Sequence, residues 1–153
     1  MAKLTGPVAV TPASDSHSRH ATALASLGSR AYSEFGEYVY VTAGEAISAS
    51  GDPVSLDGGL GAVKRGDADT EGAFFGVAES PFASGESGYV CVKGFDPDGV
   101  DSVVASGAVA GDFLEMSGTE GQFKKITSSG VAVAVALEAS DDASTARIDI
   151  MLL

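Results

Sequence analysis

The sequence predicts an all-β protein, with a small β-barrel or β-sandwich at residues 34–153 behind an N-terminal arm at residues 1–33. From Glu34 onward apolar side chains recur with a period of two, as expected for half-buried strands. Turn residues interrupt this pattern at intervals of about 8–12 residues. The chain contains 20 Gly and no Trp, and its apolar residues are largely Ala and Val, a composition that suits short strands and tight turns.

The period-two pattern assigns the strands in order along the chain. Asp57-Gly58-Gly59 stands between two of them and predicts a hairpin. In the run Val131–Leu137, Val and Ala alternate, which places Val on one face and small Ala on the other, where another sheet or chain can approach closely. The predicted strands are residues 38–42, 54–56, 60–63, 74–78, 88–93, 100–104, 113–116, 123–126, 131–137 and 147–152.

The arm has a different composition, with Pro7, Pro12, a serine-rich run and both histidines. It holds the one helical signal, a short helix over residues 19–27 capped by Ser18 and stopped by Gly28. A helix this short needs a surface to pack against. We therefore expect the order of the arm to depend on a partner.

Landmarks within the body repeat at a nearly constant distance. Gly51-Asp52 returns as Gly111-Asp112, Val77-Ala78-Glu79 as Ala136-Leu137-Glu138, and Tyr89–Val92 as Arg147–Ile150, with offsets of 60, 59 and 58 residues. Three landmarks in the same order predict two related β units, at about residues 46–94 and 107–152. Stacked together, the two units would close one barrel or sandwich.

Charge and cysteine content exclude several classes. The formal net charge of −12 disfavours nucleic-acid and anionic-membrane partners, because phosphate groups repel an acidic surface. No stretch approaches the 18 apolar residues of a membrane span, and the N-terminus lacks the apolar core of a secretion signal. The single Cys91 rules out an intrachain disulfide, and a chain of this kind is expected to be made in the cytoplasm.

Candidate metal sites are weak. His17 and His20 form an H-x-x-H pair without two further zinc ligands nearby, so we interpret them as exposed arm residues. Asp96, Asp98 and Asp101 surround Gly99 in an acidic turn that could hold calcium, but the spacing differs from that of an EF-hand loop. Asp67, Asp69 and Glu71 form a second acidic loop, interpreted as solvated. We therefore assign no metal ligand and no cofactor.

The parts of an enzyme active site are also missing from the pattern. The sequence has neither a G-x-S-x-G elbow nor a phosphate-binding G-x-x-x-x-G-K-[ST] loop. Cys91 alternates with Tyr89 and Lys93 on one strand and is interpreted as a buried, inert thiol. We assign no catalytic residue and expect that the protein is not an enzyme.

The order of landmarks in the body resembles a family of tailed-bacteriophage capsid decoration proteins, also called cement or head-fibre proteins. The likeness lies in Gly51-Asp52-Pro53-Val54, Gly76–Glu79, Ala110–Leu114, the run Val131–Ala139 that reads VAVAVALEA, and the terminal Ile148-Asp149-Ile150. It covers about residues 44–153, and the segment from Gly36 to Val41 also looks like the lead into the β body of such virion proteins.

The resemblance implies a tulip-like β body, commonly a homotrimer, on the outer face of the phage head. It implies that the partners are the major capsid protein and further copies of the chain, and that the arm grips the shell and so stabilises it against genome pressure. On this interpretation the capsid contacts are the apolar arm residues Leu4, Val8, Val10, Leu24 and Leu27. The alternatives are another virion component, such as a tail-tube, baseplate or head-completion protein, and a non-viral carbohydrate-binding β-sandwich, which the absence of Trp disfavours.

Overall fold

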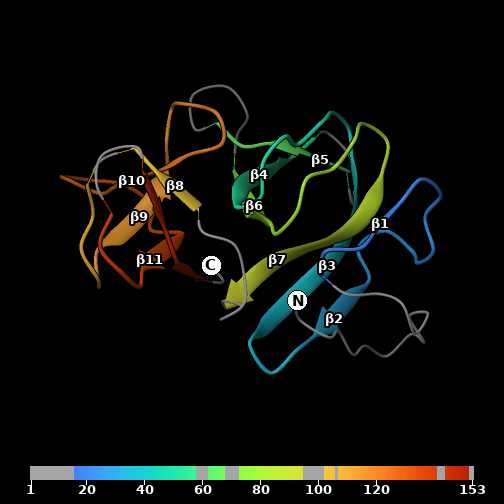
Figure 1. Ribbon diagram of the computed structural model, residues 1–153, viewed down its shortest axis with the longest axis horizontal. Coiled ribbons are helices and arrows are strands. Elements are labelled where there is room, and N and C mark those ends of the chain that lie inside the picture. Colours follow the sequence, from blue (N-terminus) through green and yellow to red (C-terminus); the bar gives the residue numbers. More distant parts are fainter. Residues whose placement is uncertain are drawn as a thin grey trace.

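The computed structural model describes residues 16–57, 62–67, 73–94, 102–105, 107–140 and 144–151, and its regular structure is β throughout (Figure 1). The predicted all-β class and small barrel are confirmed. None of the described residues is helical. The strands are β1 (Arg19–His20), β2 (Arg30–Tyr32), β3 (Gly36–Ala43), β4 (Asp52–Leu56), β5 (Ala62–Arg65), β6 (Phe74–Ala78), β7 (Ser87–Gly94), β8 (Ser102–Val104), β9 (Phe113–Met116), β10 (Phe123–Lys125), β11 (Ala134–Ala136), β12 (Ser144–Ala146) and β13 (Ile148–Ile150).

Strands β3 to β7 close a small barrel, called here the first ring. β3 pairs with β7, β7 with β6, β6 with β4, and β4 with β5, all antiparallel. The ring closes where β5 pairs in parallel with β3, with Val63 opposite Ala43. The predicted hairpin is therefore present as the antiparallel β4–β5 pair, although residues 58–61 between them lie outside the described residues.

Strands β8 to β13 repeat this arrangement as the second ring. The β9–β10 pair places Leu114 opposite Lys125, and the β4–β5 pair places Val54 opposite Arg65. The equivalent residues of the two pairs are therefore 60 positions apart in the sequence. The parallel closing pair also recurs, with Val104 opposite Phe123. β12 and β13 together take the place of β7, β12 pairing with β8 and β13 with β11.

This repetition of register shows that the chain contains two related β units. It also extends the repeat upstream of the predicted boundaries, because β3 and β8 are equivalent although their sequences show no obvious likeness. The two units were expected to close one barrel or sandwich together, and they do not. Each closes its own ring, because each has a parallel strand pair that completes the circuit.

Apolar side chains fill the two rings at equivalent positions. Val54 and Val63 of the first ring correspond to Leu114 and Phe123 of the second, and all four are fully buried. Phe123 is larger than its counterpart Val63. At another pair of equivalent positions the order is reversed, because Phe82 of the first ring corresponds to the small Ser140 of the second. The core of the first ring consists of Val39, Val41, Ala43, Ile47, Val54, Val63, Ala78, Phe82, Val90 and Val92.

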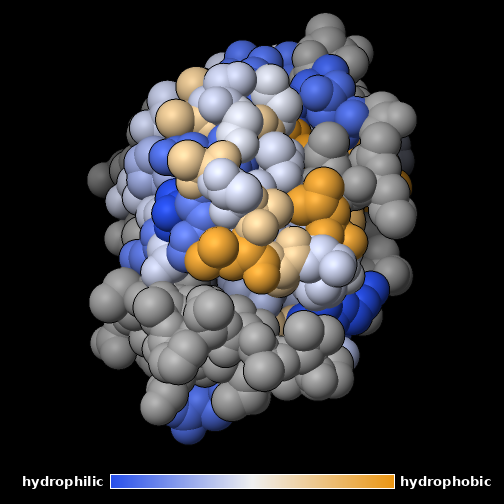
Figure 2. Space-filling view, turned by 90° about the vertical axis from the view of Figure 1, so that its right-hand side faces the viewer, coloured by the Kyte–Doolittle hydropathy of each residue, from blue (hydrophilic) through white to orange (hydrophobic). Residues whose placement is uncertain are grey.

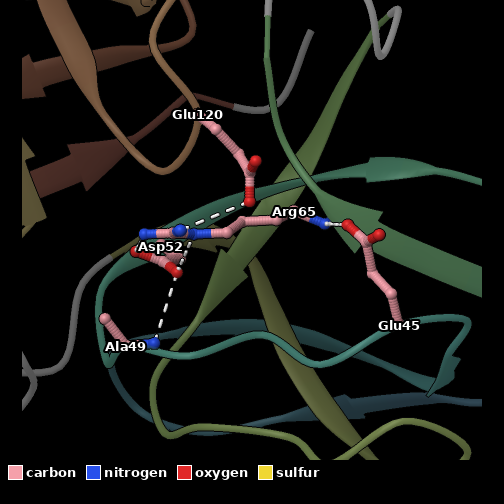
Figure 3. Close-up of polar contacts among 5 residues, drawn as sticks. All are labelled: Glu45, Ala49, Asp52, Arg65 and Glu120. Atoms are coloured by element: carbon pink, nitrogen blue, oxygen red, sulfur yellow. Dashed lines mark hydrogen bonds and ion pairs between the residues drawn. The ribbon is translucent and has the colours of Figure 1, made fainter.

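The two rings meet through backbone pairing, a polar contact and an apolar cluster that both share, in which the Phe74 and Phe123 rings lie 5.9 Å apart. Ile150 at the end of β13 pairs with Gly94 at the end of β7. The guanidinium of Arg65 donates from Nε to Asp52 in the same ring at 2.6 Å, and from Nη1 to Glu120 on the β9–β10 turn of the second ring at 3.3 Å (Figure 3). Met116 of the second ring is buried with its Sδ 3.7 Å from Ser55 Oγ. The rings therefore form one packed body.

The predicted helix over residues 19–27 is wrong. Residues 19–20 form β1, which pairs with β7, and residues 30–32 form β2 on the edge of β3. Gly28 does adopt a positive φ of 84°, but at a turn between strands rather than at a helix end. Two short strands joined by bends and turns are favoured because the strands pair the ends of this segment with β7 and β3, whereas a helix with two leucines has too little apolar surface to be stable on its own.

Candidate interaction surfaces

Arg19 fastens the N-terminal segment (residues 16–33) to the first ring. Its guanidinium donates to the carbonyl oxygens of Ser16 and Ser18 within the segment, at 3.0 and 2.9 Å. It also donates to the carbonyl oxygens of Ser80 and Pro81 after β6, at 2.7 and 3.2 Å. The same group lies 3.7 Å above the centre of the Phe82 ring, a cation–π contact.

Further contacts cover the outer face of β3 and β7. The Tyr38 hydroxyl donates to the buried Glu79 carboxylate at 3.0 Å, and His17 Nε2 lies 3.7 Å from its other oxygen. The backbone N–H of Leu24 donates to the Tyr40 hydroxyl at 3.1 Å. The described part of the arm is therefore an integral cover of the barrel, and both histidines lie half-buried in it.

Three large apolar side chains of this segment point to solvent and form the N-terminal patch: Leu24, Leu27 and Tyr32, with exposed fractions of 53%, 40% and 46%. Figure 2 views the side of the molecule that carries β1 and the following loop, where hydrophobic atoms gather near the centre among hydrophilic ones. Of the predicted capsid contacts, Leu24 and Leu27 are thus exposed on a segment that hydrogen bonds attach to the first ring. Leu4, Val8 and Val10 lie outside the described residues.

A second apolar surface, the β9–β11 patch, lies on the second ring at the opposite end of the molecule's long axis (Figure 1). It consists of Val109, Phe113, Val131 and Leu137. None of these four residues was predicted as a site from the sequence. The signal available was the alternation of Val and Ala in residues 131–137, because the buried Ala134 and Ala136 leave Val135 half-buried and Leu137 exposed, although Val133 is itself buried.

Equivalent carboxylates anchor the same turn in the two rings. Asp52 accepts from the N–H of Ala49, and Asp112 accepts from the N–H of Val109, 60 residues later. Arg65 pairs with Asp52, and Lys125 pairs with Asp112 at 2.9 Å. Burial raises the pKa of Asp52 despite the opposing hydrogen bond from Arg65.

The half-buried Asp112 behaves in the opposite way. The backbone N–H of Val109, followed by Lys125, lowers the pKa of its carboxyl. For Arg65, burial acts to lower the pKa, but the hydrogen bonds and charges of Asp52 and Glu120 together outweigh it, and the net shift is upward. Arg65 therefore remains a cation at the junction of the rings.

The structure locates the remaining candidates as follows. Cys91 is buried, as predicted. Asp96, Asp98 and Asp101 lie outside the described residues, and so do Asp69 and Glu71 of the other acidic loop. Among the residues that the structure describes, no three His, Cys, Asp or Glu side chains gather as a metal site. Within the same residues, no helix is long and apolar enough to cross a membrane.

The similarity of this chain to known proteins is structural. No family model matches the chain, and no curated protein matches it. Among the solved structures, the chain is similar to the N-terminal base of the head fibre protein gp8.5 of bacteriophage phi29. The identity is 12%, the match covers 74% of this chain and 92% of the phi29 chain, and the TM-score is 0.49. A likeness at this level does not by itself assign a function.

Proposed function

We propose that this chain is a structural protein of a tailed-phage virion that binds the outer surface of the head and stabilises the shell of major capsid protein. The observation that carries the proposal is the N-terminal patch. Leu24 and Leu27 are exposed on a segment that Arg19 and Tyr40 hold on a rigid barrel. The sequence resemblance to capsid decoration proteins supplies the class of partner.

The physical argument concerns the cost of binding. Ordering a mobile peptide on a surface costs conformational entropy, which reduces affinity. β1 and β2 already pair with β7 and β3 before any partner arrives. Between them, the N–H groups of Leu24 and Gly28 donate to the hydroxyl and the carbonyl of Tyr40, so burying Leu24 and Leu27 requires little further ordering. Each leucine side chain that passes from water into a contact contributes about 1.5–3 kcal/mol when burial is complete.

The arrangement also determines how the contact should be tested. Deleting residues 1–30 would remove the Arg19 contacts and part of β2, so a loss of binding would follow from damage to the barrel alone. The sharper variant is the double substitution Leu24→Ser and Leu27→Ser. Its matched control is Leu56→Ser, which alters a leucine that is 47% exposed outside the N-terminal segment.

The assay is co-sedimentation of purified protein with phage heads that lack it. We expect the wild type and Leu56→Ser to saturate the heads at hundreds of copies per particle, and the double variant to bind at least about tenfold more weakly. Undiminished binding of the double variant would show that the N-terminal patch does not contact the phage head. Saturation at six or twelve copies would instead indicate a vertex or connector component.

A further inference from the structure

A buried carboxylate of the first ring lies under the N-terminal segment. Glu79, directly after β6, is 5% exposed. Its Oε2 atom lies 3.7 Å from Nε2 of His17 in the segment, and its Oε1 atom accepts from the Tyr38 hydroxyl at 3.0 Å. The segment is attached beside the carboxylate, because the Ser80 hydroxyl donates to the His17 carbonyl at 3.1 Å. Two titratable side chains from different parts of the chain therefore meet inside one contact.

Comparison with the second ring indicates that the segment, and not the ring itself, buries Glu79. In each ring a glycine N–H donates to the carbonyl of the residue before this position, which is Ala78 in the first ring and Ala136 in the second. Leu137 is therefore the counterpart of Glu79, and it is 38% exposed. The side chain at this position points away from the interior of the ring, and in the first ring the N-terminal segment covers it.

We propose that the His17–Glu79 pair makes the attachment of the N-terminal segment depend on pH, with attachment favoured when the pair has taken up a proton. With a neutral His17 and an ionised Glu79, the contact buries a net negative charge, which is unfavourable. One added proton makes the pair neutral, whether it resides on the imidazole or on the carboxylate. The attached state therefore holds this proton more tightly than the detached state does, so the segment opens more often as the pH rises.

The charges around the pair leave histidine as the group to consider between about pH 5 and 8, where its charge ordinarily changes. Arg19 keeps its positive charge throughout this range, so it offsets the buried carboxylate to the same extent at every pH. Tyrosine and glutamate in water titrate outside the range. On the described elements around the pair, the titratable and charged groups are Arg19 and His20 on β1, Tyr38 and Tyr40 on β3, Glu86 before β7, and Tyr89 on β7.

The inference concerns the free protein and does not require head binding. The segment also carries the N-terminal patch, so a change in its attachment changes the ordering cost of any contact made through Leu24 and Leu27. The test below uses the purified chain without heads. A failure of the proposed function therefore leaves its result unaffected.

Hydrogen exchange of the purified chain at about pH 5.5 and about pH 8 tests the inference, because histidine changes its charge between these values. The exchange rates of residues 17–24 are divided by those of the unstructured chain at each pH, which gives the degree of opening of the segment. We expect the wild type to open at least about threefold more at the higher pH, a modest factor because His17 is partly exposed to solvent.

Glu79→Gln is the decisive variant, since it removes the buried charge but keeps an oxygen that can accept from Tyr38. Its segment should be at least as protected as that of the wild type at the higher pH, and equally protected at the lower pH. In His17→Gln the ratio of opening at the two pH values should fall toward one. His20→Gln is the matched control, because it removes the other histidine of the segment and should keep the wild-type ratio.

Three results would overturn the inference, given unchanged protection of β3 and β7 as evidence of folding. The first is equal opening of the wild-type segment at the two pH values. The second is a Glu79→Gln variant that keeps the wild-type ratio or is less protected than the wild type at the higher pH. The third is loss of the ratio in His20→Gln, which would assign the pH dependence to the other histidine.

Discussion

The two equivalent aspartates, Asp52 and Asp112, hold the same turn with opposite electrostatic consequences. Asp52 has a raised pKa because of burial, and Asp112 has a lowered pKa because of its hydrogen bonds to Val109 and Lys125. A raised folded-state pKa means that the native state takes up a proton first as the pH falls, whereas a lowered pKa means that the unfolded state does. As the pH falls, Asp52 therefore acts to raise the free energy of unfolding, whereas Asp112 acts to lower it.

We predict opposite pH trends for Asp52→Asn and Asp112→Asn. As the pH falls from 7 to just below the ordinary value of 3.8, the stability of the wild type relative to Asp52→Asn should rise, because protonation relieves the buried charge. Relative to Asp112→Asn, the wild type should lose its advantage as the pH falls through and below 3.8. Urea unfolding of the three proteins between pH 3 and 7 measures both trends, and parallel curves would contradict the assignment.

Two glycines with the same backbone conformation differ in their surroundings. Gly94 has a φ of 86° and Gly85 a φ of 84°, so alanine at either site is strained by about 1 kcal/mol or somewhat more. At Gly94 an added Cβ would also overlap the Phe35 carbonyl oxygen and meet the Gly36 Cα at 2.9 Å, whereas Gly85 has open space.

We therefore predict that Gly94→Ala is more destabilising than Gly85→Ala by about 1–3 kcal/mol, the usual cost of overpacking. The measurement is the free energy of unfolding in urea for both variants. Equal losses at the two sites would mean that the close approach of β3 and β7 at Gly94 is not present in solution.

Among the elements, β1 is the shortest strand, and the side chain of Arg19 makes most of the contacts that hold it in place. β1 comprises only two residues, and Arg19 supplies donors to four carbonyl groups and the contact with Phe82. We predict that Arg19→Ala frees residues 16–20 while the barrel stays folded. Hydrogen exchange should show faster exchange in that segment and unchanged protection in β3 and β7.

The control for this prediction is Arg30→Ala, which removes an ion pair with Glu37 between β2 and β3. Arg30 is half exposed, and exposed ion pairs contribute little to stability. Its exchange profile should stay close to that of the wild type. Unchanged exchange at residues 16–20 in Arg19→Ala would show that the backbone pairing of β1 with β7 is sufficient.

The elements differ in how far the sequence could predict them. β6 and β9 match their predicted bounds, because apolar runs there are bounded by turn residues. β12 was missed, since Ser-Thr-Ala carries no apolar alternation and pairs only because β8 lies beside it. β1 and β2 depend on contacts with β7 and β3 that no local pattern records.

The candidate surfaces were predictable only in part. Leu24 and Leu27 could be named from the sequence, because two leucines in a polar arm have few partners. Phe113 and Val131 could not, because the face that a strand side chain occupies depends on register, and a shift of one residue reverses it. The internal repeat was visible through its turns, whereas the equivalence of β3 and β8 required the parallel pairings.

For the whole molecule, the contacts between the rings predict one cooperative unfolding transition. Arg65 joins Asp52 to Glu120, Met116 packs against Ser55, and β13 pairs with β7. Scanning calorimetry should give a calorimetric enthalpy close to the van't Hoff enthalpy. Two separated transitions would show that the rings fold as independent domains.

The proposed position of the protein on the outside of the phage head can be observed by cryo-electron microscopy of heads that lack this protein, before and after it is added. We expect added density at lattice-repeated positions on the outside of the shell, in hundreds of copies, with the segment that carries Leu24 and Leu27 facing the major capsid protein. Added density at a single vertex or inside the shell, or no added density at all, would contradict it.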